Sequence, residues 1–228
     1  MWKILLNFLF PRRCVSCGKL GYYICSRCQL KIHPIKTLVC PVCERASIDG
    51  ATHPGCKTKY SLDGLVSIWV YDGAVKKAIK ELKYRFVTDL ADELISLIDT
   101  TLIYRYMRTG DFIITPVPLH WRRQHWRGFN QAEILGRMIA EKFGIKLVPD
   151  LLVRKKSTRP QVELRGKERR ENIANVFAIN PRFSKIHNLT SNILLFDDVW
   201  TTGATLRTCG NILKRAGAKM VWGLTLAR

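Results

Sequence analysis

The sequence predicts an α/β protein in which a mainly parallel sheet, flanked by helices, follows a small metal-binding module. Two observations carry this prediction. Seven of the eight cysteines lie before residue 60, and residues 111–228 alternate short apolar runs with amphipathic segments of helical period. Alternation of that kind is typical of parallel strands joined by crossover helices. We therefore divide the chain into a cysteine-rich module, residues 1–60, and an α/β domain, residues 61–228.

The period of the apolar residues places the strands and helices of the α/β domain. An apolar run over 65–71 predicts its first strand. Two helical patterns follow, and the apolar residues that share a face are Val75, Ile79 and Leu82 in the first and Leu90, Leu94, Leu97 and Ile98 in the second. The later elements are predicted, in order, as strand 112–119, helix 131–143, strand 147–153, a basic polar stretch 155–171, strand 192–196, helix 205–216 and strand 220–226.

The charge of the chain points to its partners. Lys and Arg total 38 against 18 Asp and Glu, which gives a formal net charge of +20 and a pI near 9.9. Such an excess predicts a polyanionic partner, namely nucleic acid, a phosphorylated metabolite or an anionic membrane surface. A basic surface that serves only solubility is the plainer alternative. Hydrophobic residues make up 47% of the chain, which excludes a globally disordered protein.

The N-terminus bears on the compartment. Residues 1–10 are apolar, but Asn7 interrupts them, Pro11 and two arginines follow, and no small-residue cleavage site precedes Cys14. The segment therefore does not read as a signal peptide, and it is too short to span a bilayer. We expect it to pack on the protein or to touch a membrane surface. The protein is then cytoplasmic, at or near the inner face of the membrane, where reduced thiols favour metal binding over disulfides.

The cysteine-rich module contains four ligand pairs, each separated by two residues. A two-residue gap forms a tight knuckle that directs two ligands at one ion, and a tetrahedral zinc ion needs two such pairs. The spacing predicts one or two structural Zn²⁺ ions, and the spacing also permits an interleaved pairing. For His53 the alternative to a zinc ligand is an ordinary histidine in a loop. The simplest pairing gives one site of Cys14, Cys17, Cys25 and Cys28 and a second of Cys40, Cys43, His53 and Cys56. Cys209 lies in an apolar helical pattern and reads as a small buried hydrophobe.

The segment 192–205 has the pattern of a phosphate-binding loop. A buried strand ends in two acids, and a Thr/Gly turn then opens a helix, whose N-terminal N–H groups suit a phosphate. Hydroxyl groups add donors, and Gly203 lets the backbone approach a ligand. The two carboxylates would repel a phosphate, so ribose hydroxyls with a nearby Mg²⁺ are their natural partners. The predicted binding residues are Asp197, Asp198, Thr201, Thr202, Gly203, Ala204 and Thr205.

This segment resembles the signature with which type I phosphoribosyltransferases bind phosphoribosyl pyrophosphate (PRPP), and other blocks resemble the ComF/GntX family. The resemblance covers essentially the whole chain and implies the type I phosphoribosyltransferase fold, with PRPP bound together with Mg²⁺. The matching blocks are Leu82 to Tyr84, Pro116 to Leu119, Arg123, Arg127 to Gln131, and the set Gln161, Leu164, Arg169, Asn172 and Phe177.

The resemblance also implies how a pyrophosphate group would be met. Arginine forks suit its oxygens, and the candidates are Arg123, Arg127, Arg159, Arg165 and Arg169. The stretch 155–171 has the length and charge of an active-site lid, with a solvated basic loop as the alternative. No residue identifies an acceptor or a catalytic group. The sequence therefore supports PRPP binding more strongly than catalysis.

Three functions are compatible with these features. The family resemblance implies a competence protein required for natural transformation, which handles incoming single-stranded DNA at the cytoplasmic side. Trp121 and Trp126 among basic residues favour contact with single strands, although ordinary packing is the alternative for both. A second hypothesis is an active PRPP-dependent phosphoribosyltransferase of unknown acceptor in metabolism. In a third, the zinc module binds a helicase or pore protein of DNA uptake.

Overall fold

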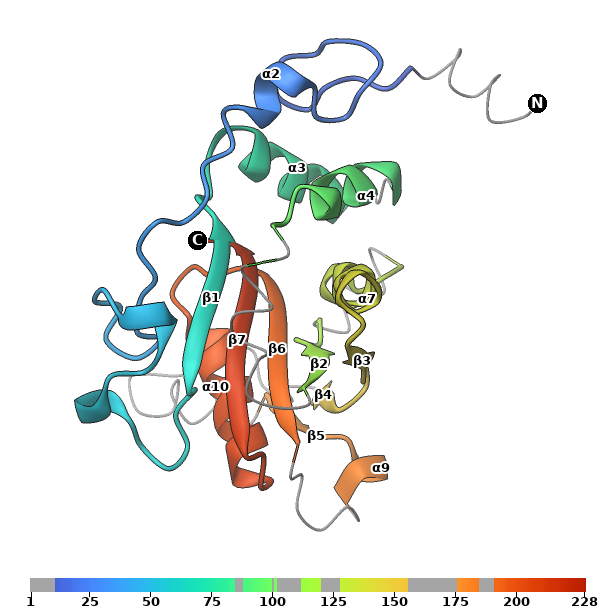
Figure 1. Ribbon diagram of the computed structural model, residues 1–228. Coiled ribbons are helices and arrows are strands. Elements are labelled where there is room, and N and C mark those ends of the chain that lie inside the picture. The colour runs from blue at the N-terminus through green and yellow to red at the C-terminus, as the bar shows by residue number, and fades with distance from the viewer. Residues whose placement is uncertain are drawn as a thin grey trace, which may run out of the picture.

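The computed structural model describes residues 11–84, 88–99, 101, 112–119, 128–155, 176–184 and 191–228. At its centre stands a five-stranded sheet with strand order β1-β7-β6-β2-β3, in which every neighbouring pair is parallel (Figure 1). Parallel neighbours need crossover connections, and helices supply them here. The prediction of a mainly parallel sheet flanked by helices after a small N-terminal zinc-binding module is confirmed.

The elements run in the following order. The described part of the N-terminal region, from residue 11, contains the short helical turns α2 (Ser26–Gln29), η1 (Ile48–Gly50) and η2 (Pro54–Cys56). The α/β region then contains β1 (Gly64–Trp69), α3 (Gly73–Tyr84), α4 (Thr88–Ser96), β2 (Phe112–Pro116), α7 (Gln131–Phe143), β3 (Lys146–Leu147), β4 (Leu152–Arg154), β5 (Phe177–Ile179), α9 (Pro181–Ser184), β6 (Asn192–Val199), α10 (Ala204–Arg215) and β7 (Met220–Ala227).

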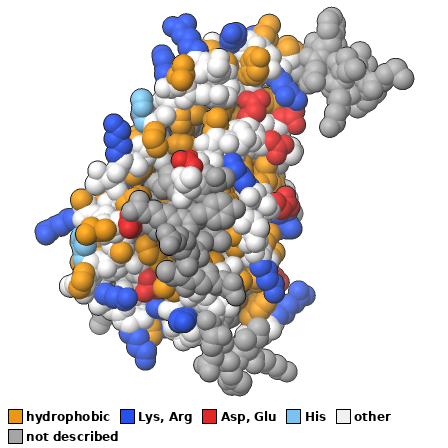
Figure 2. Space-filling model, in the orientation of Figure 1, with side chains coloured by type: hydrophobic (Ala, Val, Ile, Leu, Met, Phe, Trp, Pro, Cys, Tyr) orange, Lys and Arg blue, Asp and Glu red, His pale blue; other side chains and the backbone are white. Residues whose placement is uncertain are grey.

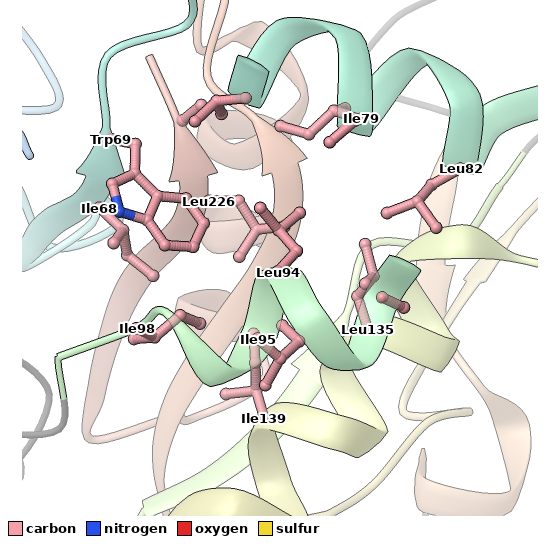
Figure 3. Packing of buried hydrophobic residues seen from close by; sticks show 14 of the residues in the cluster. Ile68, Trp69, Ile79, Leu82, Leu94, Ile95, Ile98, Leu135, Ile139 and Leu226 are labelled. Carbon is pink, nitrogen blue, oxygen red and sulfur yellow. The ribbon is translucent and has the colours of Figure 1, made fainter. Parts of the chain in front are cut away.

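The central strand β6 divides the core into two layers. Its side chains alternate between the faces of the sheet, so that Leu194 and Phe196 join one hydrophobic cluster while Ile193 and Leu195 join the other. The first cluster is covered by α3, α4 and α7, and Figure 3 shows their side chains interleaved. The second cluster is covered by α10. Burial on both faces explains why the strand reads as a continuous apolar run.

Two predicted elements differ from the structure. The single strand expected over 147–153 is two strands: β3 pairs with β2, whereas β4 pairs antiparallel with β5 in a separate ribbon. Pro149 lies between them and has no N–H to continue a ladder. The strand expected over 192–196 extends to Val199. Asp197 and Asp198 therefore lie within the last residues of β6, where it still pairs with β7, and not beyond the strand.

The cysteine-rich region packs on the α/β region in two places. Its first part contacts α4, where the Glu93 carboxylate accepts the backbone N–H groups of Tyr23 and Ile24. Its second part lies beside β1 (Figure 1). The same region forms isolated antiparallel bridges to both ends of β1, Pro34 to Trp69 and Ala51 to Gly64. The domain boundary near residue 60 stays a prediction. In the part of the chain described here, no helix has the length and apolar character needed to cross a bilayer.

Candidate functional site

The loop between β6 and α10 is shaped by a tryptophan and a glycine. The Trp200 side chain is buried beneath the loop, and the backbone N–H of Trp200 donates to the carbonyl of Ala227 at the end of β7. Gly203 has φ of 67°, in the left-handed region, and a Cβ there would overlap Cζ2 of the Trp200 ring. Both constraints favour glycine. The loop therefore turns sharply over the indole and starts α10 directly beside the end of β6.

Two adjoining hollows, of about 200 Å³ and about 180 Å³, open at this edge of the sheet. Four side chains line both of them, namely Lys83, Asp197, Asp198 and Thr205. Of the other predicted residues, Thr201, Gly203 and Ala204 line the second hollow. Thr202 lines neither hollow, and its carbonyl oxygen accepts a hydrogen bond from Nη1 of Arg207 at 2.9 Å. Its role in binding stays a prediction.

The two acids of the loop are in different electrostatic environments. Asp198 forms an ion pair with Lys83, with 2.9 Å between Oδ2 and Nζ. Burial and, after it, the Asp198 charge raise the pKa of Asp197, while the N–H of Asp198 and the Lys83 ammonium lower it. The net result is a pKa of about 7. The N–H of Asp198 donates to Oδ1 of Asp197 at 2.9 Å. Near neutral pH the pair therefore carries less than its full negative charge.

Lys83 was not predicted as a site residue. It lies at the end of α3, far from the loop in sequence, and its only signal was the Leu82 to Tyr84 block of the family resemblance. The helix brings its ammonium to the carboxyl end of β6. A cation in this position offsets the repulsion between the acids and an anionic ligand.

The opposite wall of the first hollow comes from the N-terminus of α7. Asn130 caps this helix by accepting the N–H of Ala132, and its Nδ2 donates to the carbonyl of Val117 at 3.2 Å, which ties the helix to the chain after β2. Gln131 is 3% exposed, and its Nε2 donates to Ile79. Its Oε1 is buried without a hydrogen-bond partner among the described residues. Both residues line the hollow, and the sequence indicates them only through the family resemblance.

The basic candidates for the pyrophosphate are not among the residues that the structure describes. Arg123, Arg127, Arg159, Arg165 and Arg169 lie outside the described residues, as do Trp121 and Trp126. Their predicted contacts stay predictions. Within the described part of the chain, the cationic side chains that line the first hollow are Lys83 and Arg154.

The cysteine-rich region brings its eight predicted ligands together in two clusters, grouped as in the simplest pairing. Ligand atoms within each cluster lie within 4.8 Å of one another. In the first cluster, burial raises the pKa of the Cys14 thiol, but the N–H groups of Cys25, Cys17 and Ser16 outweigh burial and lower it to about 6. A thiol that ionises so readily is a good metal ligand. The first cluster comprises Cys14, Cys17, Cys25 and Cys28.

The second cluster contains the histidine, and its geometry argues for a ligand. Nε2 of His53 lies 3.0 Å from the carbonyl oxygen of Ala46, which only accepts, so Nε2 carries the proton. Nδ1 then presents its lone pair, and it lies 3.4 Å from Sγ of Cys43. A carbonyl that fixes the tautomer of a ligating histidine is a common feature of zinc sites. The second cluster comprises Cys40, Cys43, His53 and Cys56.

Four protein ligands in each cluster suit structural zinc, since no position is left for a reacting water. Cys209, the remaining cysteine, is fully buried in α10. Burial raises the pKa of its thiol above the ordinary range. It lies apart from both clusters and packs as an apolar side chain.

Both zinc-ligand clusters lie within a stretch that matches a known domain family. Residues 5–57 match the double zinc ribbon domain family. Competence protein F of Haemophilus influenzae is 32% identical over 235 aligned residues, which cover 98% of this chain and 100% of that protein. DNA utilization protein YhgH of Escherichia coli O157:H7 is 30% identical and covers 92% of each chain. Competence protein ComFC of Bacillus subtilis is 25% identical, with 90% of this chain and 84% of that protein aligned.

Among solved structures, adenine phosphoribosyltransferase of Saccharomyces cerevisiae aligns with 60% of this chain and 69% of its own. The TM-score is 0.35 and the sequence identity 16%. The enzyme of the same name from Leishmania tarentolae aligns with 66% of this chain and 74% of its own, at a TM-score of 0.34 and 16% identity.

Proposed function

Because this chain belongs to the competence protein F family, we propose that it is a competence protein, required for natural transformation, that handles incoming single-stranded DNA. We place this work on the cytoplasmic side of the membrane, where the zinc ligands stay reduced. We further propose that the α/β domain binds PRPP with Mg²⁺. The observation that carries this part is the convergence of Lys83, Asp197, Asp198 and Thr205 on the two hollows beside the β6–α10 loop.

The start of α10 provides the support for a phosphate. Its N-cap is Gly203, and no side chain of the described residues caps it. The first N–H groups of a helix have no partner within the helix, and its dipole favours an anion there. Thr201 and Thr205 line the same hollow and add hydroxyl donors. The 5-phosphate of PRPP fits this donor set.

The acids support the sugar end of the ligand. Carboxylates accept hydrogen bonds from ribose hydroxyls, and Asp197 and Asp198 line both hollows. Mg²⁺, when bound with PRPP, would neutralise pyrophosphate charge. The Lys83 ammonium, which now pairs with Asp198, lies where it can also meet an anionic oxygen of the ligand.

Calorimetry with PRPP and Mg²⁺ tests this site. We expect saturable binding by the zinc-loaded protein, weaker binding without Mg²⁺, and loss of binding in the double variant Asp197→Asn/Asp198→Asn. Asp92→Asn is the matched control, because Asp92 is exposed on α4 and lines neither hollow. Equal binding by the double variant and the wild type would refute the proposed site.

The proposed DNA contact is supported by the net charge of +20. On the face in Figure 2, Lys and Arg side chains are distributed around the margin and are not confined to one patch, which suits a flexible strand that follows several contacts. Anisotropy of a labelled single strand, titrated between low and physiological salt, measures this contact. We expect the logarithm of affinity to fall with the logarithm of salt by roughly 0.7 per neutralised phosphate. A flat dependence would contradict electrostatic binding of the strand.

The predicted stacking residues provide a second test of DNA handling. Trp121→Ala and Trp126→Ala are each expected to weaken single-strand binding by about 1–3 kcal/mol, the usual contribution of a stacked base. Tyr22→Ala is the control, because Tyr22 is a largely exposed aromatic residue in the region of the first zinc cluster. The same variants, placed in the chromosome, are expected to lower transformation frequency in the order of their binding defects.

An active phosphoribosyltransferase of unknown acceptor is the alternative function. It is favoured by the buried Oε1 of Gln131, which lacks a partner among the described residues beside the first hollow. A buried acceptor of this kind is costly unless a ligand satisfies it. Release of pyrophosphate from PRPP on addition of nucleobases or other amine acceptors would establish transfer. If PRPP binds but no pyrophosphate is released with any of these acceptors, the protein binds PRPP without catalysing transfer.

The zinc module is the proposed contact for a helicase or pore protein of DNA uptake. Its support is an exposed apolar side chain, Leu30, which is 86% exposed. Co-purification of such a partner is expected to be lost in Leu30→Glu. Ile48→Glu is the comparison, since Ile48 is equally exposed at 87% in the second part of the module. Unchanged co-purification in Leu30→Glu would exclude this face.

A further inference from the structure

One side chain, Arg207, connects the second zinc cluster with the phosphate loop. It stands in the second turn of α10, and all three of its guanidinium nitrogens donate hydrogen bonds. Nε donates to the carbonyl of Pro41 at 2.5 Å and Nη2 to Oε1 of Glu44 at 2.6 Å. Nη1 donates in the other direction, to the carbonyl of Thr202 at 2.9 Å.

The contacts on the zinc side belong to the knuckle itself. Pro41 is buried between the ligands Cys40 and Cys43, and Glu44 follows directly. Glu44 has a left-handed φ of 60°, and its N–H donates to the carbonyl of Cys40 at 2.9 Å. Left-handed backbone at a non-glycine residue persists only where surrounding structure enforces it. Bound zinc fixes a knuckle of this type, and so fixes where Arg207 is held.

The contacts on the loop side reach the phosphate-binding backbone. Thr202 precedes Gly203, the N-cap of α10. The guanidinium carbon also lies 5.1 Å from the centre of the Trp200 ring, and that ring supports Gly203 from below. One planar cation thus holds the carbonyl and the indole that set the path of the loop.

The first zinc cluster has no comparable connection in the described contacts. Its region is held by Glu93 and Asp89 of α4 and by Lys77 of α3. These helices cover the opposite layer of the core from α10. The two clusters are therefore unequal in their relation to the loop.

We propose that Arg207 is a positioning residue that transmits the geometry of the second zinc knuckle to the phosphate loop, so that loss of metal from Cys40, Cys43, His53 and Cys56 loosens the loop. The loosening of the loop follows from the contacts alone. Its effect on PRPP affinity rests on the proposed function.

Hydrogen exchange of residues 199–206 in the zinc-loaded full chain, without ligand, tests the inference. Arg207→Ala is expected to raise the exchange rate of this segment by about fivefold or more, the usual size of coupling between sites. Arg207→Lys is expected to behave as Arg207→Ala does, because a lysine keeps the charge but not the fork of donors. Rescue by lysine, or unchanged exchange in both variants, would overturn the inference. Arg137→Ala is the matched control, since Arg137 is exposed and forms an ion pair with Glu133 of its own helix.

Paired ligand variants test the dependence on the second cluster. Cys17→Ser and Cys43→Ser each replace the exposed cysteine of one cluster, and zinc content confirms the loss of metal. Exchange of 199–206 is expected to rise in Cys43→Ser and to rise much less in Cys17→Ser. Equal effects would overturn the inference. Glu44→Gln, which keeps every metal ligand, is expected to raise exchange in the same segment, so the test does not depend on whether Cys43→Ser folds.

PRPP binding by the same variants separates the two proposals. If the wild type binds PRPP, affinity is expected to fall about fivefold or more in Arg207→Lys. If the wild type does not bind PRPP, the proposed function fails, while the exchange data still decide whether Arg207 couples the knuckle to the loop.

Discussion

Lys83 and Asp198 form an ion pair, 2.9 Å between Nζ and Oδ2, whose side chains are 27% and 13% exposed. It joins the end of α3 to the end of β6 across the hollows. Removing the lysine would leave the mostly buried Asp198 carboxylate unpaired beside Asp197. An unpaired buried polar group destabilises the fold by about 1–3 kcal/mol, and a charged one by more.

Lys83→Met is therefore expected to lower the free energy of unfolding by about 1–3 kcal/mol at neutral pH. Denaturant titration of the zinc-loaded protein measures this change. Lys80→Met is the control, because Lys80 is exposed on the same helix. Equal stability of the two variants would mean that solvent already screens the pair.

The raised pKa of Asp197 predicts a pH dependence of stability. Its folded-state pKa of about 7 lies above its ordinary value of 3.8, so ionisation favours the unfolded chain. Its contribution to stability is then lost as the pH rises from about 4 to about 7. The side chain at this position in the variant Asp197→Asn cannot ionise. The difference in free energy of unfolding between this variant and the wild type is therefore expected to shift by about 1–2 kcal/mol in favour of the variant as the pH rises from 5.5 to 8. Denaturant titrations at both values, with zinc in excess, check this; a constant difference between the two proteins would contradict the shift.

Gly203→Ala is expected to displace the phosphate loop. The new Cβ would overlap the Trp200 ring, in addition to the cost of about 1–2 kcal/mol for left-handed backbone in an alanine. Gly144→Ala isolates the second term, because Gly144 has a similar φ of 65° but open space around its Cβ position. PRPP binding is expected to be lost in Gly203→Ala and kept in Gly144→Ala. Retention in both would show that the loop adapts.

Metal analysis tests the two clusters. We expect two zinc ions per chain, about one in His53→Ala, and two in Cys209→Ala. The reason is that Nδ1 of His53 faces Cys43, whereas Cys209 is buried in α10 apart from both clusters. Atomic emission of the purified proteins provides the count. A full complement of zinc in His53→Ala would make the histidine an ordinary loop residue.

The sequence predicts well what neighbouring residues determine. The strand, acids, turn and helix between Asn192 and Arg215 are encoded by consecutive residues, and the structure has them in that order. The pairs of zinc ligands are local in the same sense. The family resemblance added the expectation of a phosphoribosyltransferase fold, which periodicity alone could not distinguish from other parallel α/β folds.

The sequence does not predict contacts between distant segments. Arg207 and Pro41 are 166 positions apart, and nothing in either local pattern indicates that they meet. The β4–β5 ribbon has the same cause, since it pairs Arg154 with Phe177 across the basic stretch. Lys83 lies at the site because α3 packs on one face of the sheet and ends beside Asp198 of β6.

The bridges from the cysteine-rich region to both ends of β1 have a consequence for shortened forms of the protein. β7 pairs with one side of β1, and these bridges contact the backbone of β1 at Gly64 and Trp69. A chain cut to residues 61–228 would present the outer side of β1 as a bare strand edge, a template for pairing with another copy. Such a fragment is expected to aggregate. A transformation defect in a strain that carries it would then report insolubility, and single substitutions are the way to assign a role to the module.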